Sequence, residues 1–251
     1  MISKNKTKLI QSLSRKKNRE QSELFWAEGK RLIDQLRQFN FNFHTIIALP
    51  GQINSYSDID CDKIEADFDE IKKVSLLKSP PEVLAICYQK PTLLSTVLCE
   101  RELVIALDDV QDPGNLGTII RLASWFGIKH IVCSENSADC YNPKVIQSTM
   151  GAIANVSVHY TNLVSFLENA GRKKLSIYGT FLDGENIYET SLNKNGIIVM
   201  GNEGKGISEP VAHLIDKKLL IPSFAESNSQ VESLNVSMAT SIICSEFKRR
   251  K

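Results

Sequence analysis

From residue 103 onward, short apolar runs alternate with stretches whose apolar residues recur at helical spacing. The apolar runs lie at residues 103–107, 130–133, 176–181, 197–201 and 219–222, and the helical stretches at 118–126, 143–150, 163–170 and 233–250. Such alternation predicts strands and helices in turn, and hence a parallel sheet covered on both faces. Ligands of sheets of this kind usually bind in the loops beyond the carboxyl ends of the strands.

The first 90 residues mix both kinds of pattern. Helical spacing of apolar residues is found at Leu9, Ile10 and Leu13, then at Leu24 and Phe25, and then at Leu32, Ile33 and Leu36. Residues 44–50 and 83–88 instead resemble buried strands. We therefore expect a smaller α/β domain at residues 1–90, a linker at 91–102 and a second domain at 103–251.

Composition excludes several protein classes. Hydrophobic residues make up 42% of the 251 residues, enough to bury a core. No apolar run approaches the roughly 20 residues of a membrane span, and the charged start is unlike a signal peptide, so we expect a cytoplasmic protein. The six cysteines and four histidines are scattered without metal-ligand spacing, which favours neither a metal site nor disulfides.

Charge indicates a partner only through its distribution. The formal net charge is +1, but basic residues are in excess in the first 37 residues and again at 248–251. Basic ends of this kind can contact phosphates, although most charged ends are simply solvated.

The first unusual loop lies at residues 108–117, after the first strand of the second domain. One proline and two glycines favour a tight turn that exposes backbone groups, and Asn115 could orient a ligand. Arg121 follows one helical turn after Gly117, so that its guanidinium could reach back toward the loop or remain solvated.

The second unusual loop, at residues 199–207, carries three glycines, Gly201, Gly204 and Gly206. It is not a phosphate-binding P-loop, because Lys205 precedes Gly206 rather than a serine or threonine. Its glycine spacing is also the reverse of a dinucleotide fingerprint, so neither of these nucleotide sites is supported.

The third unusual segment joins Ile221 and Pro222 to the last helical stretch through residues 233–237. Ser233 is well placed to cap that helix with its hydroxyl group.

Taken in order, the three segments form one pattern. They resemble the three motifs of the SpoU or TrmH-like branch of the SPOUT superfamily of RNA methyltransferases. The first motif corresponds to Asn115, Gly117 and Arg121, the second to residues 201–206, and the third to Ile221–Pro222 with Ser233–Ser237. The resemblance covers about residues 103–249. Residues 25–36 resemble, more faintly, the substrate-binding domain often attached to this branch.

The resemblance implies an α/β fold whose C-terminal segment forms a deep trefoil knot, with S-adenosylmethionine held in the knot. Mainly backbone groups would hold this cofactor; the positions carried over are Thr180, Gly201, Asn202, Gly206, Ile221 and Leu234. The reaction implied is methyl transfer to a ribose 2′-hydroxyl of ribosomal or transfer RNA. The family also implies a homodimer formed through the knotted domain. No metal is expected, because the cysteines and histidines lack metal-ligand spacing.

The same resemblance implies five residues in the chemistry: Asn115, Arg121, Glu203, Ser233 and Asn235. Because the pKa of an arginine exceeds about 12, we expect Arg121 to clamp phosphate or oxyanion charge rather than to act as a base. Glu203 could orient its loop or act near the sulfonium group. One departure is a longer, glycine-free loop at residues 223–231. The alternative is an RNA-binding or ribosome-assembly protein that keeps the fold without the chemistry.

Overall fold

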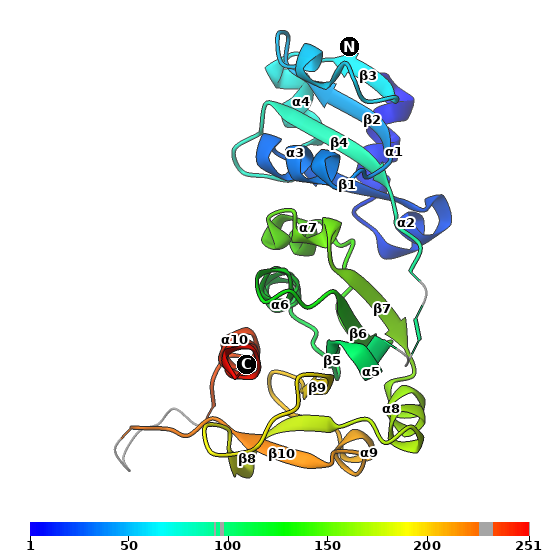
Figure 1. Ribbon diagram of the computed structural model, residues 1–251. Helices are drawn as coiled ribbons and strands as arrows, with labels where there is room; N and C mark the ends of the chain where they lie inside the picture. Colours follow the sequence, from blue (N-terminus) through cyan, green and yellow to red (C-terminus); the bar gives the residue numbers. More distant parts are fainter. Residues whose placement is uncertain (93, 96–97, 226–232, 251) are drawn as a thin grey trace. The chain divides into compact units, whose positions relative to one another are not determined.

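We describe a computed structural model of the chain for residues 1–92, 94–95, 98–225 and 233–250 (Figure 1). By packing, it forms two compact units. The first unit comprises Met1–Pro91 and Asp139–Ala154, and the second comprises Thr92–Ala138 and Asn155–Lys251. Each unit has its own sheet.

The sheet of the first unit has the strand order β1-β4-β2-β3. Its strands are β1 (Leu24–Glu28), β2 (Phe43–Ala48), β3 (Asp62–Glu65) and β4 (Val83–Tyr88). Strand β4 is antiparallel to both of its neighbours, and β2 is parallel to β3. The helices that come from the first 91 residues are α1 (Lys4–Ser12), α2 (Lys16–Ser22), α3 (Lys30–Gln38), η1 (Ile53–Tyr56) and α4 (Phe68–Val74).

Alternation along β1 divides the core of this unit between the two faces of the sheet. Leu24 and Trp26 belong to a buried cluster with residues of α1 and α4. Phe25 points to the opposite face, because successive side chains of a strand alternate. There its ring lies 6.0 Å from that of Phe41 and 4.9 Å from that of Tyr141, centroid to centroid.

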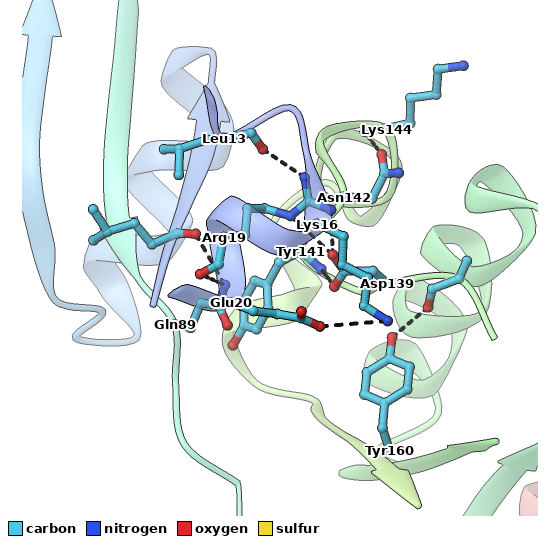
Figure 2. A network of polar contacts seen from close by, with 12 residues as sticks. Leu13, Lys16, Arg19, Glu20, Gln89, Asp139, Tyr141, Asn142, Lys144 and Tyr160 are labelled. Atoms are coloured by element: carbon cyan, nitrogen blue, oxygen red, sulfur yellow. Dashed lines mark hydrogen bonds and ion pairs between the residues drawn. The ribbon is translucent and has the colours of Figure 1, made fainter. Parts of the chain in front are cut away.

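The segment 139–154 packs in the first unit, although it lies inside the second domain expected from the sequence. It carries α7 (Pro143–Thr149) and η2 (Ala152–Ala154). Figure 2 shows its polar anchor, in which the buried guanidinium of Arg19 donates to Asp139 and to the carbonyl oxygen of Leu13. The backbone N–H of Tyr141 donates to the same Asp139 carboxylate, 2.9 Å away.

The sheet of the second unit is parallel throughout and has the strand order β10-β8-β9-β5-β6-β7. Its strands are β5 (Leu103–Leu107), β6 (His130–Ser134), β7 (Ser157–Thr161), β8 (Ile177–Asn186), β9 (Gly196–Met200) and β10 (Lys217–Leu220). The α/β fold with a parallel sheet, preceded by a smaller domain, is therefore present as expected.

Helices lie against the second sheet. They are α5 (Leu98–Arg101), α6 (Pro113–Trp125), α8 (Leu163–Arg172), α9 (Glu209–Ala212) and α10 (Val236–Arg249). One buried cluster joins Phe166 and Leu167 of α8 and Val211 of α9 to strand residues. Helix α10 packs on α6, and its Phe247 meets Tyr178 of β8 edge to face, with the ring centroids 4.9 Å apart.

Three local expectations were wrong. Leu24 and Phe25 lie in strand β1 rather than on a helix. All five residues of β1 are buried, and a fully buried strand lacks the alternation of polar and apolar residues by which a strand is predicted. Helix α6 begins at Pro113, inside the segment expected to be a loop, and its N-cap is Asp112. Proline suits the first position of a helix, so this proline starts the helix instead of turning the chain. Helix α10 is capped by Asn235, not by Ser233.

The sequence patterns also left some elements unpredicted. Strands β3 and β7 have mixed polarity: β3 has no buried residue and β7 has only two, which explains why neither forms an apolar run. Most of the glycine-free loop, residues 226–231, lies outside the described residues.

Candidate active site

The loops that carry the three motifs lie at one edge of the parallel sheet. They follow β5, β9 and β10, whose carboxyl ends share that edge because these strands run in the same direction. The first loop leads directly into α6, where the carboxylate of Asp112 accepts a hydrogen bond from the backbone N–H of Asn115 at 2.8 Å. Asn115 and Gly117 therefore lie in the first turns of a helix.

The second loop folds back on itself. The backbone groups of Asn202 and Gly206 exchange two hydrogen bonds, of 2.9 and 3.0 Å. The side-chain oxygen of Asn202 accepts from the N–H groups of Gly204 and Lys205, both at 3.0 Å. A Cβ atom at Gly201 would lie 2.2 Å from the backbone carbon of Gly206, so this close approach requires a glycine.

Three contacts fasten the second loop to the first. The carboxylate of Asp108 accepts from the N–H of Ser208, the residue directly after the second loop, at 2.7 Å. The side-chain amide of Asn202 donates to the carbonyl oxygen of Asp109 at 2.7 Å. Glu203 makes the third contact, and because the three contacts lie at different points of both loops, the loops form one joined structure.

The carboxylate of Glu203 is the acceptor at the centre of the site. It accepts from the N–H groups of Gln111 and Asp112, at 3.3 and 3.1 Å, and from the side-chain amide of Asn115 at 3.0 Å. Partial burial disfavours its charged form, but the hydrogen bonds outweigh this effect and lower the pKa of Glu203. The group is therefore held as a carboxylate, which suits an acceptor that shapes the loops.

Asn235 connects the third motif to the other two. Its side-chain amide donates to the side-chain oxygen of Asn115 at 2.9 Å, while its own oxygen caps α10 by accepting from the N–H groups of Ser237 and Met238. The side-chain amide of Asn115 donates in turn to the carboxylate of Glu203. The structure thus joins one predicted residue from each motif in a continuous series of hydrogen bonds.

Two other residues predicted for the chemistry lie outside this series. Arg121 lies on α6 with an exposed side chain, and it makes no hydrogen bond or ion pair within the described part of the chain. Ser233 is exposed two residues before the cap of α10, and its predicted capping role belongs to Asn235. An exposed guanidinium without a protein partner is available to a ligand.

The residues predicted to hold the cofactor lie at the same edge of the sheet. Thr180 follows the part of β8 that pairs with β9, and its hydroxyl lies 3.9 Å from the sulfur of Met200. Gly201 follows β9, Ile221 follows β10, and Leu234, 49% exposed, precedes α10. Asn202 and Gly206 bond to each other, and the hydrogen bonds of Asn202 favour a role in shaping the loop over direct contact.

The sequence patterns missed Asp108, Asp109 and Ser134 as members of the site. The side chain of Ser134 bonds to Asp109 at the end of β6, the strand beside β5. The signal that could have found the two acids is their position, since they are a polar pair directly after a buried strand. Ser134 carries no such signal, because only the neighbouring strand makes it part of the site.

The described residues include no group of three or more histidine, cysteine or acidic side chains arranged to hold a metal ion. Nor does any helix in that part of the chain have the length and apolar character needed to cross a membrane.

Comparison with known proteins shows the family to which the chain belongs. Residues 102–245, more than half of the chain, match the SpoU rRNA Methylase family. The chain belongs to this family. Residues 4–85 match the MRM3-like substrate binding domain, which agrees with the faint resemblance in residues 25–36.

One curated relative matches nearly the whole chain. The 23S rRNA (guanosine(2553)-2′-O)-methyltransferase RlmP of Bacillus subtilis is 28% identical over 250 residues, 95% of this chain and 94% of that protein. Several further curated relatives are matched over only 53% to 65% of their length.

Solved structures agree with these matches. A TrmH-family protein from Porphyromonas gingivalis covers 100% of both chains with 36% identity and a TM-score of 0.90. The AdoMet-bound rRNA methyltransferase from Sinorhizobium meliloti is 25% identical, covers 99% of this chain and 97% of its own, and has a TM-score of 0.86.

Proposed function

We propose that this protein transfers a methyl group from S-adenosylmethionine to a ribose 2′-hydroxyl of ribosomal or transfer RNA. The observation that carries the proposal is the series of hydrogen bonds that joins Asn235, Asn115 and Glu203, one residue from each of three separate motifs. The names of the relatives agree, since one is an rRNA 2′-O-methyltransferase and another is an rRNA methyltransferase bound to AdoMet.

The loops fit a cofactor that is recognised largely by backbone groups. Gly201, Gly204 and Gly206 leave the second loop without side chains that would block access, and only a glycine fits at Gly201. Apolar side chains that could flank an adenine ring remain partly exposed at Ile221 and Leu234. When bound, the cofactor supplies an electrophilic methyl group; the protein supplies the position of the acceptor.

Arg121 is the residue best suited to hold RNA at this site. Its guanidinium is exposed and has no partner in the described part of the chain, whereas the side chains of Asn115 and Glu203 already bond to each other and to other protein groups. A fixed cation can bind a phosphate by paired hydrogen bonds and stabilise the oxygen that gains negative charge as its proton leaves. Precise placement of the hydroxyl would provide much of the rate.

The first unit is the proposed RNA-binding domain, corresponding to residues 1–90 with 91–102 as the linker. A shallow hollow of about 490 Å³ along α3 is lined by Lys30, Arg31, Asp34, Gln35 and Gln38. Basic side chains at such a surface attract phosphates, which position RNA without reading its sequence.

We also propose that the protein is a homodimer through its second unit. Trp125 of α6 is 84% exposed and Met238 of α10 is 60% exposed, and these two helices pack on each other. Exposed large apolar residues on neighbouring helices suit a surface that a second copy covers. Light scattering at micromolar concentration should give a dimer mass, and Trp125→Glu should give a monomer mass.

The trefoil knot and a cytoplasmic location complete the proposal. The last strand, β10, lies at the outer edge beside β8, yet the chain returns to pack α10 on α6, which agrees with a threaded C-terminal segment. Arg250, the last residue described, donates to the carbonyl oxygens of Ile187 and Thr190. A cytoplasmic location agrees with an RNA substrate.

The deciding experiment is mass-spectrometric mapping of ribose methylation in RNA from a deletion strain and its parent. We expect one 2′-O-methyl mark to disappear and to return when the gene is restored. Calorimetric titration with S-adenosylmethionine complements this experiment. A folded protein that neither binds the cofactor nor changes any mark would instead be an RNA-binding or assembly protein on the same fold.

A further inference from the structure

Asp109 adopts an unusual backbone conformation at the start of the first loop. Its φ angle is +58°, in the left-handed region that residues other than glycine rarely occupy. Such a conformation persists where the surrounding structure holds it in place. The contacts around Asp109 therefore show what the site depends on.

Ser134, at the end of β6, holds Asp109 from two sides. The backbone N–H of Asp109 donates to the hydroxyl oxygen of Ser134 at 2.9 Å, and that hydroxyl donates to the Asp109 carboxylate, also at 2.9 Å. Ser137, which is buried, places its own hydroxyl 3.0 Å from that of Ser134. The reciprocal pair fixes both the backbone and the side chain of Asp109.

The left-handed conformation turns the carbonyl oxygen of Asp109 toward the second loop. This oxygen accepts from the side-chain amide of Asn202 at 2.7 Å. With its nitrogen held there, Asn202 keeps its oxygen in place to accept from the N–H groups of Gly204 and Lys205. The shape of the glycine-rich loop thus depends on Asp109.

We propose that Asp109 and Ser134 are positioning residues that keep residues 201–206 in the shape that binds S-adenosylmethionine. They act through the carbonyl group of Asp109 and the side chain of Asn202, not through contact with the cofactor. This inference rests on the proposed function of the same loops. It makes the end of β6, which carries none of the three motifs, part of the active-site machinery.

The first test replaces Ser134. Ser134→Ala removes the hydroxyl that holds Asp109, and Ser134→Thr keeps it. Ser157→Ala is the matched control, because Ser157 is a half-buried strand serine at the opposite end of the neighbouring strand β7. Calorimetry should show S-adenosylmethionine binding weakened about tenfold in Ser134→Ala, because both hydrogen bonds that hold Asp109 are lost, and restored in Ser134→Thr.

A second measurement reads the loop without the cofactor. Amide exchange of Gly204 and Lys205, followed by NMR, should be about tenfold faster in Ser134→Ala than in the wild type, at an unchanged melting temperature. Unchanged exchange in Ser134→Ala would overturn the inference. If exchange becomes faster but no protein, including the wild type, binds the cofactor, the loop assignment holds and the proposed function fails.

Asp109 gives an independent test based on backbone conformation. Asp109→Gly loses the carboxylate but adopts a positive φ readily, whereas Asp109→Ala loses both advantages. We therefore expect Asp109→Ala to weaken cofactor binding more than Asp109→Gly, by about fivefold. Equal losses of affinity in the two variants, or a larger loss in Asp109→Gly, would show that cofactor binding does not depend on the direction of the Asp109 carbonyl group.

Discussion

At the scale of single residues, this site separates side chains that bond to one another from one that does not. The side chain of Asn115 bonds to both Glu203 and Asn235, Glu203 also accepts from backbone N–H groups, and Asn235 also caps α10. Groups that are satisfied in this way hold loops in place. Arg121 is exposed and has no such partner among the described residues, which leaves its charge for RNA.

The first prediction concerns Arg121. We expect Arg121→Ala to bind S-adenosylmethionine with unchanged affinity but to lose methyl transfer by about a hundredfold or more, since a charge that acts in the transition state has been removed. Calorimetry and transfer of labelled methyl groups to RNA would measure the two effects. The control is Arg172→Ala, which removes another exposed arginine at the end of α8. Turnover like the wild type in Arg121→Ala would contradict the assigned role.

At the scale of elements, the parallel sheet supplies fixed strand ends and the loops supply close packing. The second loop approaches itself so closely at Gly201 that no side chain fits there. Strands β6 and β7 show a different constraint, the packing of two histidine rings. His130 and His159 lie on these two strands with stacked rings 5.5 Å apart, and a nitrogen of each lies 3.2 Å from the other.

The second prediction tests the packing of the glycine loop. A Cβ atom at position 201 would lie 2.2 Å from the carbon and 2.5 Å from the oxygen of Gly206, so Gly201→Ala must displace backbone. We expect loss of measurable cofactor binding and a lower melting temperature. Gly171→Ala is the control, because a Cβ atom there meets nothing within 4 Å and alanine favours helix α8. Normal binding by Gly201→Ala would show that the loop does not need this close approach.

The third prediction concerns pH. His159 is 3% exposed, and its ring Nδ1 has no hydrogen-bond partner among the described residues. Burial and the neighbouring His130 lower the pKa of His159 to about 4. The unfolded chain then binds a proton near pH 6.5, before the folded protein does, so stability falls as the pH drops from about 6.5 to 4. At pH 5 this loss is about 2 kcal/mol.

Urea unfolding between pH 4.5 and 7.5 measures the effect. His159→Gln should flatten the dependence of the unfolding free energy on pH, even if it lowers stability at neutral pH. His213→Gln, which alters an exposed histidine, should leave the slope as it is. A slope in His159→Gln as steep as in the wild type would assign the pH dependence to other groups.

At the scale of the whole molecule, the chain divides by packing in a way that differs from its sequence patterns. The segment 139–154 lies between β6 and β7 in sequence, yet it packs in the first unit with β1. A buried pair between Arg19 and Asp139 fixes one end of the segment. At Gly151, a Cβ atom would lie 2.5 Å from the side chain of Gln35 of α3, so the backbone itself packs closely there.

The fourth prediction follows from that buried pair. Asp139→Ala leaves the guanidinium of Arg19 buried without its carboxylate, which should cost the first unit about 3 kcal/mol. Asp58→Ala removes one partner of the exposed pair with Arg37 and should cost less than about 1 kcal/mol. Urea unfolding followed by the fluorescence of buried Trp26, in a Trp125→Phe background, compares the two. Equal losses would show that the buried pair does not secure the segment.

The sequence by itself determined the parallel α/β fold of the second domain and the three motifs, because hydrophobic alternation and glycine spacing are local properties. It also predicted Asn115, Glu203 and Asn235 as members of one site. Only the tertiary structure showed that Asn235 rather than Ser233 caps α10, that Ser134 holds Asp109, and that residues 139–154 pack in the first unit. The last two facts depend on contacts between segments distant in sequence, which no local pattern encodes. The cap is a local contact, but serine and asparagine are both common N-caps, so the sequence alone did not choose between them.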